Sequence, residues 1–376
     1  MSKKGVISKA LLLAVLLLVL ASGLAFPSCQ TARSVPRGWS GVSVIDEALF
    51  LGSMEGKLVA IDGSTQQRLW PDVPFEQKQS GGFGCAQGTQ AVAIYGTPAV
   101  TFELVYLTGY NGKAYAVNME TGALRWVYPR EDELDPIVGG PAVLGDRVYF
   151  GSSNGKLYAL DAATGDKLWE FESGDKIWGT PAVNGQTLYI GSFDKKLYAL
   201  NVADGSLKWQ FETEGAIVAT PLVYDGAVYF GSFDRHLYAL NEADGSLRWK
   251  YQADNWFWSR PLANDGIIYA GSVDGKVHAL KTESGEVVAV FDLESPISAS
   301  PVLAGGDVIV AAETGQVYSL SINPRQKKSL VNLEDEIYAP LATSDGVIYI
   351  HSADDVLYAV DARSGATLWS LELESE

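Results

Sequence analysis

A unit of about 40 residues recurs along almost the whole chain, and this repeat restricts the possible folds more than any other feature. Its clearest marker is a proline followed by small and apolar residues, with successive spacings of 43, 40, 40, 40, 40 and 39 residues. The marker prolines are Pro98, Pro141, Pro181, Pro221, Pro261, Pro301 and Pro340. A first copy without the proline begins near Trp39, which makes eight units. Repeats of this length are typical of propellers and solenoids, in which each unit packs on its neighbours.

Each unit contains four short apolar runs separated by turn residues. In residues 180–212 these runs are TPAV, TLYIGS, KLYALN and SLKWQFE. Asn184-Gly185 and Asp225-Gly226 are interpreted as the first turn of their units, because Asn-Gly and Asp-Gly pairs favour two-residue hairpins. We therefore predict four antiparallel strands per unit, connected in sequence order as a meander.

The middle strands of each unit are apolar on both faces, as Leu188 and Ile190 alternate with Tyr189. Such a strand has to be covered on both sides, and no segment of helical periodicity follows the N-terminal leader. In a propeller each sheet lies between two others, which meets this requirement. The sequence therefore predicts an all-β domain over residues 38–376: an eight-bladed β-propeller of four-stranded antiparallel blades. We expect the ring to close by packing of the last blade on the first, with no blade shared between the chain ends.

A tryptophan opens the fourth strand of most units. It follows the marker proline by 28 or 29 residues, and in the sixth and seventh units Ala289 and Ser329 take its place. We interpret these rings as packing residues between blades that diverge toward the rim, and we expect weaker junctions at Ala289 and Ser329. The tryptophans are Trp70, Trp126, Trp169, Trp209, Trp249 and Trp369.

The first 28 residues differ from all that follows. Three lysines precede an apolar run from Ala10 to Leu20, the pattern of a secretory signal peptide, and the run is short for a membrane span. Residues 26–29 resemble a lipoprotein cleavage motif that would leave a lipidated Cys29, followed by a linker over residues 29–37; ordinary cleavage after Ala25 is the alternative. We expect an exported protein, anchored through Cys29 on the extracytoplasmic side of a membrane and not by a transmembrane span.

The composition excludes several classes of function. The chain has 45 acidic and 28 basic residues, and its formal net charge of −17 repels nucleic acid, so we expect a protein partner or a neutral or cationic ligand. The second cysteine, Cys85, is a lone thiol if Cys29 is lipidated and can otherwise pair with it. The three histidines, among them His278 in place of a strand tyrosine, have no metal-ligand spacing, and calcium-loop, phosphate-cradle and nucleophile motifs are absent from the sequence.

One set of variable positions is a candidate binding site. Two residues before the recurring Thr-Pro, five of the eight units have an aromatic residue, and Trp256, Phe257 and Arg260 add to the set in the sixth unit. Because these positions lead into the innermost strands, we expect them at one end of the central channel. There they either bind a flat ligand or an apolar peptide anchor, or close the channel to water. The positions are Trp39, Tyr95, Val138, Trp178, Val218, Trp258, Ser298 and Tyr338.

A single long interruption lies between the first two units, where the spacing is 56 residues instead of 40. The extra residues fall within Pro71–Gln90, and four glycines in this stretch predict a flexible loop. Long loops in compact folds often carry function, and a plain surface excursion is the alternative.

The unit TP-x-V-x-(D/N)G-x-x-Y-x-G-S-x-D-x-x-L-Y-A-L, closed by the tryptophan, resembles the repeat of pyrroloquinoline quinone (PQQ)-type propellers over essentially all of residues 38–376. That family has an enzymatic branch, the quinoprotein alcohol dehydrogenases, and a non-enzymatic branch that includes the BamB lipoproteins of outer-membrane β-barrel assembly. The enzymatic branch implies a disulfide between adjacent cysteines and a calcium site, whereas Cys85 has no adjacent cysteine and no residues here can be assigned as calcium ligands. The resemblance therefore implies an exported, non-enzymatic scaffold with a protein partner in the cell envelope and no cofactor. The alternatives are a dehydrogenase that uses PQQ with calcium, or a ligand-binding sensor propeller.

Overall fold

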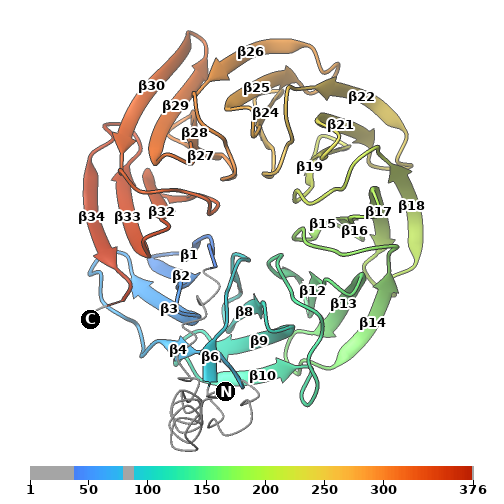
Figure 1. Ribbon diagram of the computed structural model, residues 1–376, viewed down its shortest axis with the longest axis vertical. Coiled ribbons are helices and arrows are strands. Elements are labelled where there is room, and N and C mark those ends of the chain that lie inside the picture. Colours follow the sequence, from blue (N-terminus) through green and yellow to red (C-terminus); the bar gives the residue numbers. More distant parts are fainter. Residues whose placement is uncertain (1–37, 79–88, 375–376) are drawn as a thin grey trace, which may run out of the picture.

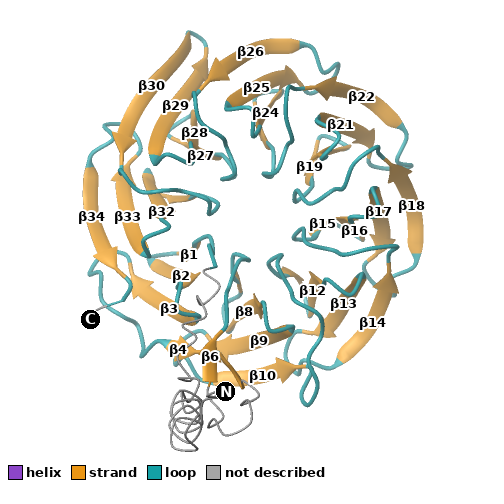
Figure 2. Cartoon of the chain, viewed as in Figure 1, coloured by secondary structure: helices purple, strands orange, loops and turns teal. Residues whose placement is uncertain are grey.

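The computed structural model describes residues 38–78 and 89–374, and every regular element in these ranges is a β-strand. Eight four-stranded sheets form a ring around a central opening (Figure 1), with only loops between their strands (Figure 2). Within each sheet consecutive strands pair antiparallel, and the first strand of each blade lies nearest the centre. The predicted eight-bladed propeller is confirmed.

The first four blades follow one another around half of the ring. Their strands are β1 (Ser43–Ile45), β2 (Ala48–Gly52), β3 (Lys57–Asp62) and β4 (Val73–Pro74) in blade 1; β7 (Ala99–Val100), β8 (Leu104–Gly109), β9 (Lys113–Asn118) and β10 (Leu124–Tyr128) in blade 2; β11 (Ala142–Leu144), β12 (Arg147–Gly151), β13 (Lys156–Asp161) and β14 (Lys167–Glu172) in blade 3; and β15 (Ala182–Asn184), β16 (Thr187–Gly191), β17 (Lys196–Asn201) and β18 (Leu207–Glu212) in blade 4.

The other four blades complete the ring with nearly the same strand lengths. Their strands are β19 (Leu222–Tyr224), β20 (Ala227–Gly231), β21 (His236–Asn241) and β22 (Leu247–Gln252) in blade 5; β23 (Leu262–Asn264), β24 (Ile267–Gly271), β25 (Lys276–Lys281) and β26 (Val287–Asp292) in blade 6; β27 (Val302–Ala304), β28 (Asp307–Ala311), β29 (Gln316–Ile322) and β30 (Arg325–Asn332) in blade 7; and β31 (Ala342–Ser344), β32 (Val347–His351), β33 (Val356–Asp361) and β34 (Thr367–Glu372) in blade 8.

The core consists of the interfaces between blades, because the middle strands are buried on both faces. Leu188 and Ile190 of β16 pack toward blade 3, beside Tyr149. Tyr189, on the opposite face of the same strand, packs toward blade 5, beside Phe230. The two-sided apolar pattern of the sequence therefore corresponds to two neighbouring sheets, as expected.

The first hairpin turn differs from the sequence-based prediction in blade 4. Asn184 is the last residue of β15 and pairs with Thr187, so the turn residues are Gly185 and Gln186 rather than Asn184 and Gly185. Only Gly185 of this turn has a positive φ, the pattern of a type II′ turn, in which glycine comes first. In blade 5 the turn is Asp225-Gly226, and both residues have positive φ, as predicted for type I′.

The ring closes by packing of blade 8 on blade 1, as expected. Leu49 and Val59 of blade 1 share a buried cluster with Leu357 of blade 8. The guanidinium of Arg68 adds a hydrogen bond of 2.7 Å to the carbonyl oxygen of Leu373. Blade 1 is built only from strands β1–β4 and blade 8 only from strands β31–β34, so no strand pairing connects the two blades. Side-chain packing and hydrogen bonds close the ring.

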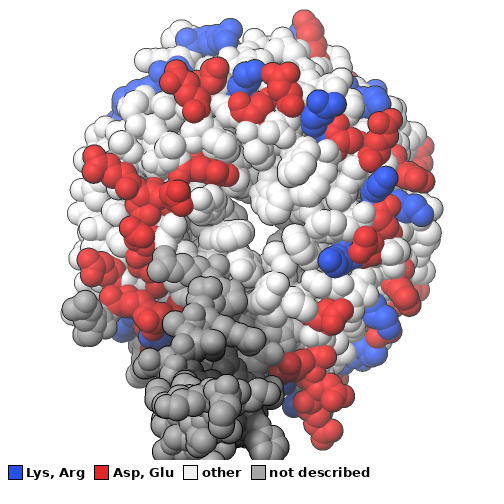
Figure 3. Space-filling model, in the orientation of Figure 1, with Lys and Arg blue, Asp and Glu red and all other residues white. Residues whose placement is uncertain are grey.

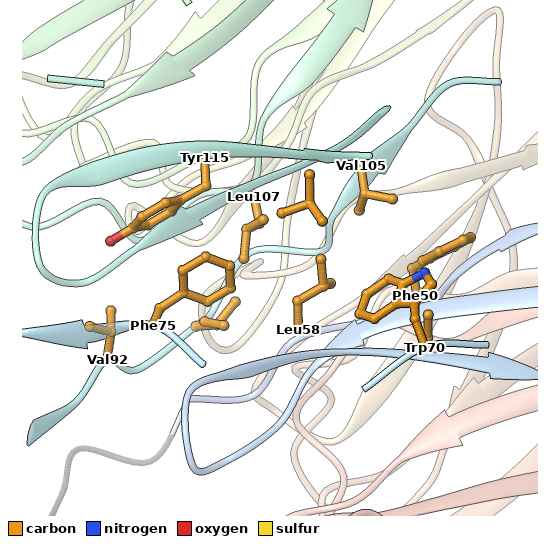
Figure 4. Close-up of a cluster of buried hydrophobic side chains, with 11 residues drawn as sticks. Phe50, Leu58, Trp70, Phe75, Val92, Val105, Leu107 and Tyr115 are labelled. Carbon is orange, nitrogen blue, oxygen red and sulfur yellow. The ribbon is translucent and has the colours of Figure 1, made fainter. Parts of the chain in front are cut away.

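The insertion between blades 1 and 2 begins and ends in a short hairpin. Strand β5 (Glu76–Lys78) pairs with β6 (Thr89–Ala91), and the glycine-rich residues between them lie outside the described residues. Phe75, just before β5, is buried, and its ring centroid lies 4.3 Å from that of Tyr115 in blade 2. Figure 4 shows Phe75 and Tyr115 in the apolar cluster between the two blades. The base of the insertion is therefore part of the core, which the prediction of a loop did not anticipate.

The recurring tryptophans form contacts between one blade and the next. The indole nitrogen of Trp126 in blade 2 donates a hydrogen bond of 2.9 Å to the carbonyl oxygen of Ala162 in blade 3. The ring covers Gly165, where an added Cβ would lie 2.6 Å from the indole. The same pair of contacts recurs at four other tryptophans, Trp70, Trp169, Trp209 and Trp249.

The junction between blades 6 and 7 has cationic contacts in place of the missing tryptophan. Arg325 and Lys327 on the long strand β30 donate hydrogen bonds of 2.6 Å to the backbone carbonyls of Val290 and Asp292. Ala289, at the tryptophan position, is buried but offers only a methyl group. Contacts from exposed cationic side chains contribute little stability compared with a docked indole.

Candidate functional site

All eight variable positions meet at one mouth of the central channel. They line a common cavity of about 120 Å³, together with the small residues that follow them. Each position precedes the innermost strand of its blade, so the eightfold repeat brings the side chains to one level. Whether this mouth binds a partner stays a prediction. The eight are Trp39, Tyr95, Val138, Trp178, Val218, Trp258, Ser298 and Tyr338.

A first aromatic cluster spans blades 8, 1 and 2. The ring centroids of Trp39 and Tyr95 are 4.7 Å apart in an edge-to-face arrangement. Trp39 also lies 5.7 Å from Tyr338, and Tyr95 lies 5.6 Å from Tyr110. Trp39 is 36% exposed, so this cluster offers an apolar surface beside the channel.

A second aromatic cluster spans blades 4 to 6. Phe233 is stacked on Trp256 at 4.6 Å and on Trp258 at 5.6 Å, with interplanar angles of 18° and 22°. Phe193 links Phe233 to Trp178, at centroid distances of 6.2 and 4.7 Å. Trp256 is 43% exposed, which leaves much of a large apolar ring in contact with solvent. Val138 and Ser298 separate the two clusters around the mouth.

Three of these aromatic residues were not identified from the sequence. Tyr110, Phe193 and Phe233 occupy the variable position of the Gly-Ser-x-Asp turn between the second and third strands. A backbone hydrogen bond holds this turn beside the loop that enters the same blade. In blade 4 the backbone nitrogen of Phe193 donates a hydrogen bond of 2.9 Å to the carbonyl oxygen of Lys176. The signal was available, because that position varies between repeats while its neighbours hardly change. It is occupied by Met54, Tyr110, Ser153, Phe193, Phe233, Val273, Glu313 and Ala353.

Arg260 extends the site into the channel. It follows Trp258 by two residues and lines both the mouth and a deeper cavity between Pro181, Val183 and Pro221. Its backbone nitrogen donates a hydrogen bond of 3.1 Å to the hydroxyl of Ser300 in the next blade. Burial lowers the pKa of its guanidinium from the ordinary value, because protein surrounds the channel, although the side chain remains open to the water inside it.

Polar groups at the mouth orient some of the rings. The indole nitrogen of Trp178 donates a hydrogen bond of 3.0 Å to the Ser153 hydroxyl. The Tyr338 hydroxyl donates to a carboxylate oxygen of Glu336 at 2.8 Å. This bond and burial raise the pKa of Tyr338 to about 12, so the hydroxyl remains a donor at physiological pH. Fixed rings of this kind need little reorganisation when a ligand binds.

The charge distribution separates the mouth from its surroundings. Figure 3 shows one face of the ring, on which most of the Asp and Glu side chains lie toward the rim and many uncharged atoms border the central hollow. The described residues that line the two channel cavities include one charged side chain, Arg260, and no carboxylate, and the carboxylates of Glu313 and Glu336 next to the mouth accept hydrogen bonds from Ser298 and Tyr338. Calcium is held by several oxygen ligands, usually with carboxylates among them, so these residues do not fit the alternative of PQQ bound with calcium.

Other candidate groups lie away from the channel or outside the described residues. His278 is buried between Tyr251 and Asp274, with ring-nitrogen contacts of 3.0 and 3.3 Å, as expected for a packed side chain. Over residues 38–78 and 89–374, no three His, Cys, Asp or Glu side chains are grouped so that they could hold a metal ion. The same ranges contain no helix of the length and apolarity that crossing a bilayer requires. The predicted leader, the predicted lipidation site Cys29 and the second cysteine, Cys85, all lie outside the described residues.

Comparisons with known proteins agree with the geometry. The family described as the β-propeller of the beta-alanine-activating enzyme matches residues 142–376, and the family described as outer membrane protein assembly factor BamB matches residues 30–175. The crystal structure of BamB from Moraxella catarrhalis is similar with a TM-score of 0.70 and 21% identity, over 85% of this chain and 92% of that one. The computationally designed Ika8 protein is similar with a TM-score of 0.71 and 16% identity, over 84% and 94%. No curated protein matches the sequence.

Proposed function

The chain is a PQQ-type β-propeller that resembles BamB and belongs, through residues 142–376, to the family of the beta-alanine-activating enzyme's propeller, and from this premise we propose that it is a non-enzymatic scaffold that binds a protein partner at the channel mouth. The observation that carries this proposal is the pair of aromatic clusters around one opening. Trp39, which lines that opening, is 36% exposed, and Trp256, which stacks with Phe233 beside it, is 43% exposed.

The composition of the mouth supports a protein interface. Tryptophan, tyrosine and arginine are the residues that most often dominate binding energy, and they do so in central, well-packed positions. Here Trp178, Trp258 and Arg260 lie around a central hollow with acidic side chains farther out. A centre rich in aromatic residues and arginine with a polar rim is the usual anatomy of a protein-binding surface.

Export and anchoring form the second part of the proposal. The signal-peptide pattern of residues 1–28 and the lipidation motif at Cys29 support attachment to an extracytoplasmic membrane surface. BamB is described as an outer membrane protein assembly factor. By analogy, the partner proposed here is a protein of the cell envelope, and the proposed role is assistance in its assembly.

The donor groups of the channel support a scaffold rather than an enzyme. The described residues around the mouth and the deeper cavity are aromatic, aliphatic, hydroxyl and amide side chains, with one guanidinium. General acid–base catalysis needs a group that titrates near the working pH, and neither cavity includes a carboxylate or a histidine among these residues.

Site-specific photo-crosslinking in the native envelope tests the proposal. A crosslinking residue at Trp256 should capture one discrete protein, whereas the same residue at Leu207 should not. Leu207 is the matched control, because it is 49% exposed and apolar but lies on the outer strand β18. Capture by neither position, or equal capture of the same proteins by both, would contradict binding at the mouth.

A further inference from the structure

One position of the channel wall differs from its seven equivalents. Two residues after each variable position, the repeat places a residue next to the inner strand, and in seven blades this residue is small or cyclic and uncharged. Blade 6 alone has a long cationic side chain there. Because the other blades form without it, the fold does not require an arginine at this place. The eight residues are Gly41, Thr97, Gly140, Thr180, Thr220, Arg260, Ser300 and Pro340.

The Arg260 guanidinium has no partner within the described part of the protein. It forms no hydrogen bond or ion pair with another described residue, although the chain carries 45 acidic residues. The described residues lining the cavities on either side of it include no carboxylate. Arginine stays protonated in proteins, so a positive charge is held in the channel without compensation. An anion bound there would pair with that charge through charge-assisted hydrogen bonds.

The surroundings of Arg260 define the remainder of such a ligand. The deeper cavity has a volume of about 310 Å³, and both apolar side chains of blades 4 and 5, among them Val183 and Val223, and the polar groups of Asn184 and Thr220 line it. Trp178 and Trp258 line the mouth above it. An apolar or aromatic group would be covered by these side chains, while its charged end would reach the guanidinium. A ligand with several negative charges would leave all but one of them unpaired in the channel.

We propose that Arg260 binds the single carboxylate of a ligand whose aromatic body lies against Trp178 and Trp258. Arginine presents two parallel N–H groups that match the two oxygens of a carboxylate. The same chemistry is offered by the C-terminal aromatic residue of a partner polypeptide and by a small free aromatic acid. The inference specifies the ligand chemistry of the proposed interaction face and rests on that proposal.

Isothermal titration calorimetry with matched probes tests the site. The probes are a short peptide ending in phenylalanine with a free carboxylate, the same peptide with a C-terminal amide, and phenylacetate. The carboxylate peptide should bind on the order of 10-fold more tightly than the amide, since charge-assisted hydrogen bonds are about twice as strong as neutral ones. Phenylacetate binding as tightly as the peptide would identify a free acid as the ligand; weaker binding would identify a chain terminus.

Variants of the same protein separate a specific site from a general charge effect. Arg260→Gln should abolish the difference in affinity between the carboxylate peptide and the amide peptide, and Arg260→Lys should keep part of this difference. Lys250→Gln removes one positive charge from an exposed position on the outer strand β22 and should leave the difference unchanged. Equal binding of carboxylate and amide by the unmodified protein, or an undiminished preference in Arg260→Gln, would overturn the inference. If either of these results is obtained and a crosslinking residue at Trp256 still captures a partner, the proposed scaffold function is supported although the carboxylate site is not.

Discussion

The indole nitrogen of Trp209 lies 3.0 Å from the carbonyl oxygen of Glu242 in the following blade, and the same ring covers Gly245. One side chain therefore provides both a hydrogen bond and apolar contact between two sheets that share no backbone pairing. Because the core of this propeller consists of such interfaces, the stability of the ring depends on contacts of this type.

Trp209→Ala should lower the free energy of unfolding by about 3 kcal/mol, the lower end of the range for such truncations, because the ring is only partly buried. The loss combines a cavity between blades 4 and 5 with an unpaired carbonyl of Glu242. Chemical denaturation followed by circular dichroism measures it. Trp256→Ala is the control, since that ring is 43% exposed and lies outside the buried clusters between blades, so its removal should change stability by less than about 1 kcal/mol. Equal losses in the two variants would contradict the assigned roles.

Gly245→Ala should also destabilise the protein, and the size of the effect should depend on Trp209. Gly245 has a φ of +72°, and an added Cβ would lie 2.5 Å from the Trp209 ring. A side chain there suffers both backbone strain and a steric clash, at a cost of about 1–3 kcal/mol. In the Trp209→Ala background only the backbone strain remains, so the cost should fall. A double-mutant cycle measures this coupling, and strictly additive losses would show that the two residues do not interact.

Hydrogen exchange should be fastest in blades 6 and 7 among the eight blades. Their outer strands have Ala289 and Ser329 where the other blades have a docked tryptophan. The contacts of Arg325 and Lys327 to β26 are exposed and replace that packing only in part. Arg325→Ala should accelerate exchange in β26 and leave β18 unchanged. Mass spectrometry of peptides from both strands reports the result, and blades 6 and 7 emerging as the best protected would refute the prediction.

The junction of blades 8 and 1 should lose stability as the pH rises. Burial and the neighbouring Glu55 raise the pKa of Glu374 to about 7 from its ordinary value of 4.5. The folded state therefore holds this proton more tightly than the unfolded state, so its contribution is complete below pH 4.5 and is lost as the pH rises to about 7. Melting temperatures between pH 5 and pH 8 should accordingly fall more in the unmodified protein than in Glu374→Gln. Glu372→Gln, an exposed carboxylate on β34, should behave like the unmodified protein.

Addition of PQQ with calcium should produce no alcohol dehydrogenase activity and no quenching of tryptophan fluorescence. The reason is the donor set of the channel, whose described lining residues include no carboxylate to hold calcium. A fluorescence titration and a dye-reduction assay with primary alcohols measure the two properties. Quenching at micromolar PQQ together with alcohol turnover would restore the dehydrogenase alternative.

The blade count and the ring of variable residues could be predicted because a repeat carries its geometry from one copy to the next. Because Trp178 and Trp258 occupy equivalent positions in their repeats, both side chains are expected at the same level of the channel. The stacking of Phe233 on Trp256 could not be predicted in this way, because it depends on how two separate turns approach each other across a blade boundary. The turn at Gly185 was placed one residue too early, since an Asn-Gly pair was given more weight than the register of its neighbours.

Each blade is one uninterrupted segment of chain, and this has a mechanical consequence. A force applied to the two chain ends acts directly on the interface between blades 8 and 1, where side chains rather than strand pairing hold the ring together. The ring should yield there first, and the terminal blades should then unravel one at a time. Each event would release about 40 residues, on the order of 140 Å of extended chain, so the force–extension curve should show a sawtooth of nearly equal steps.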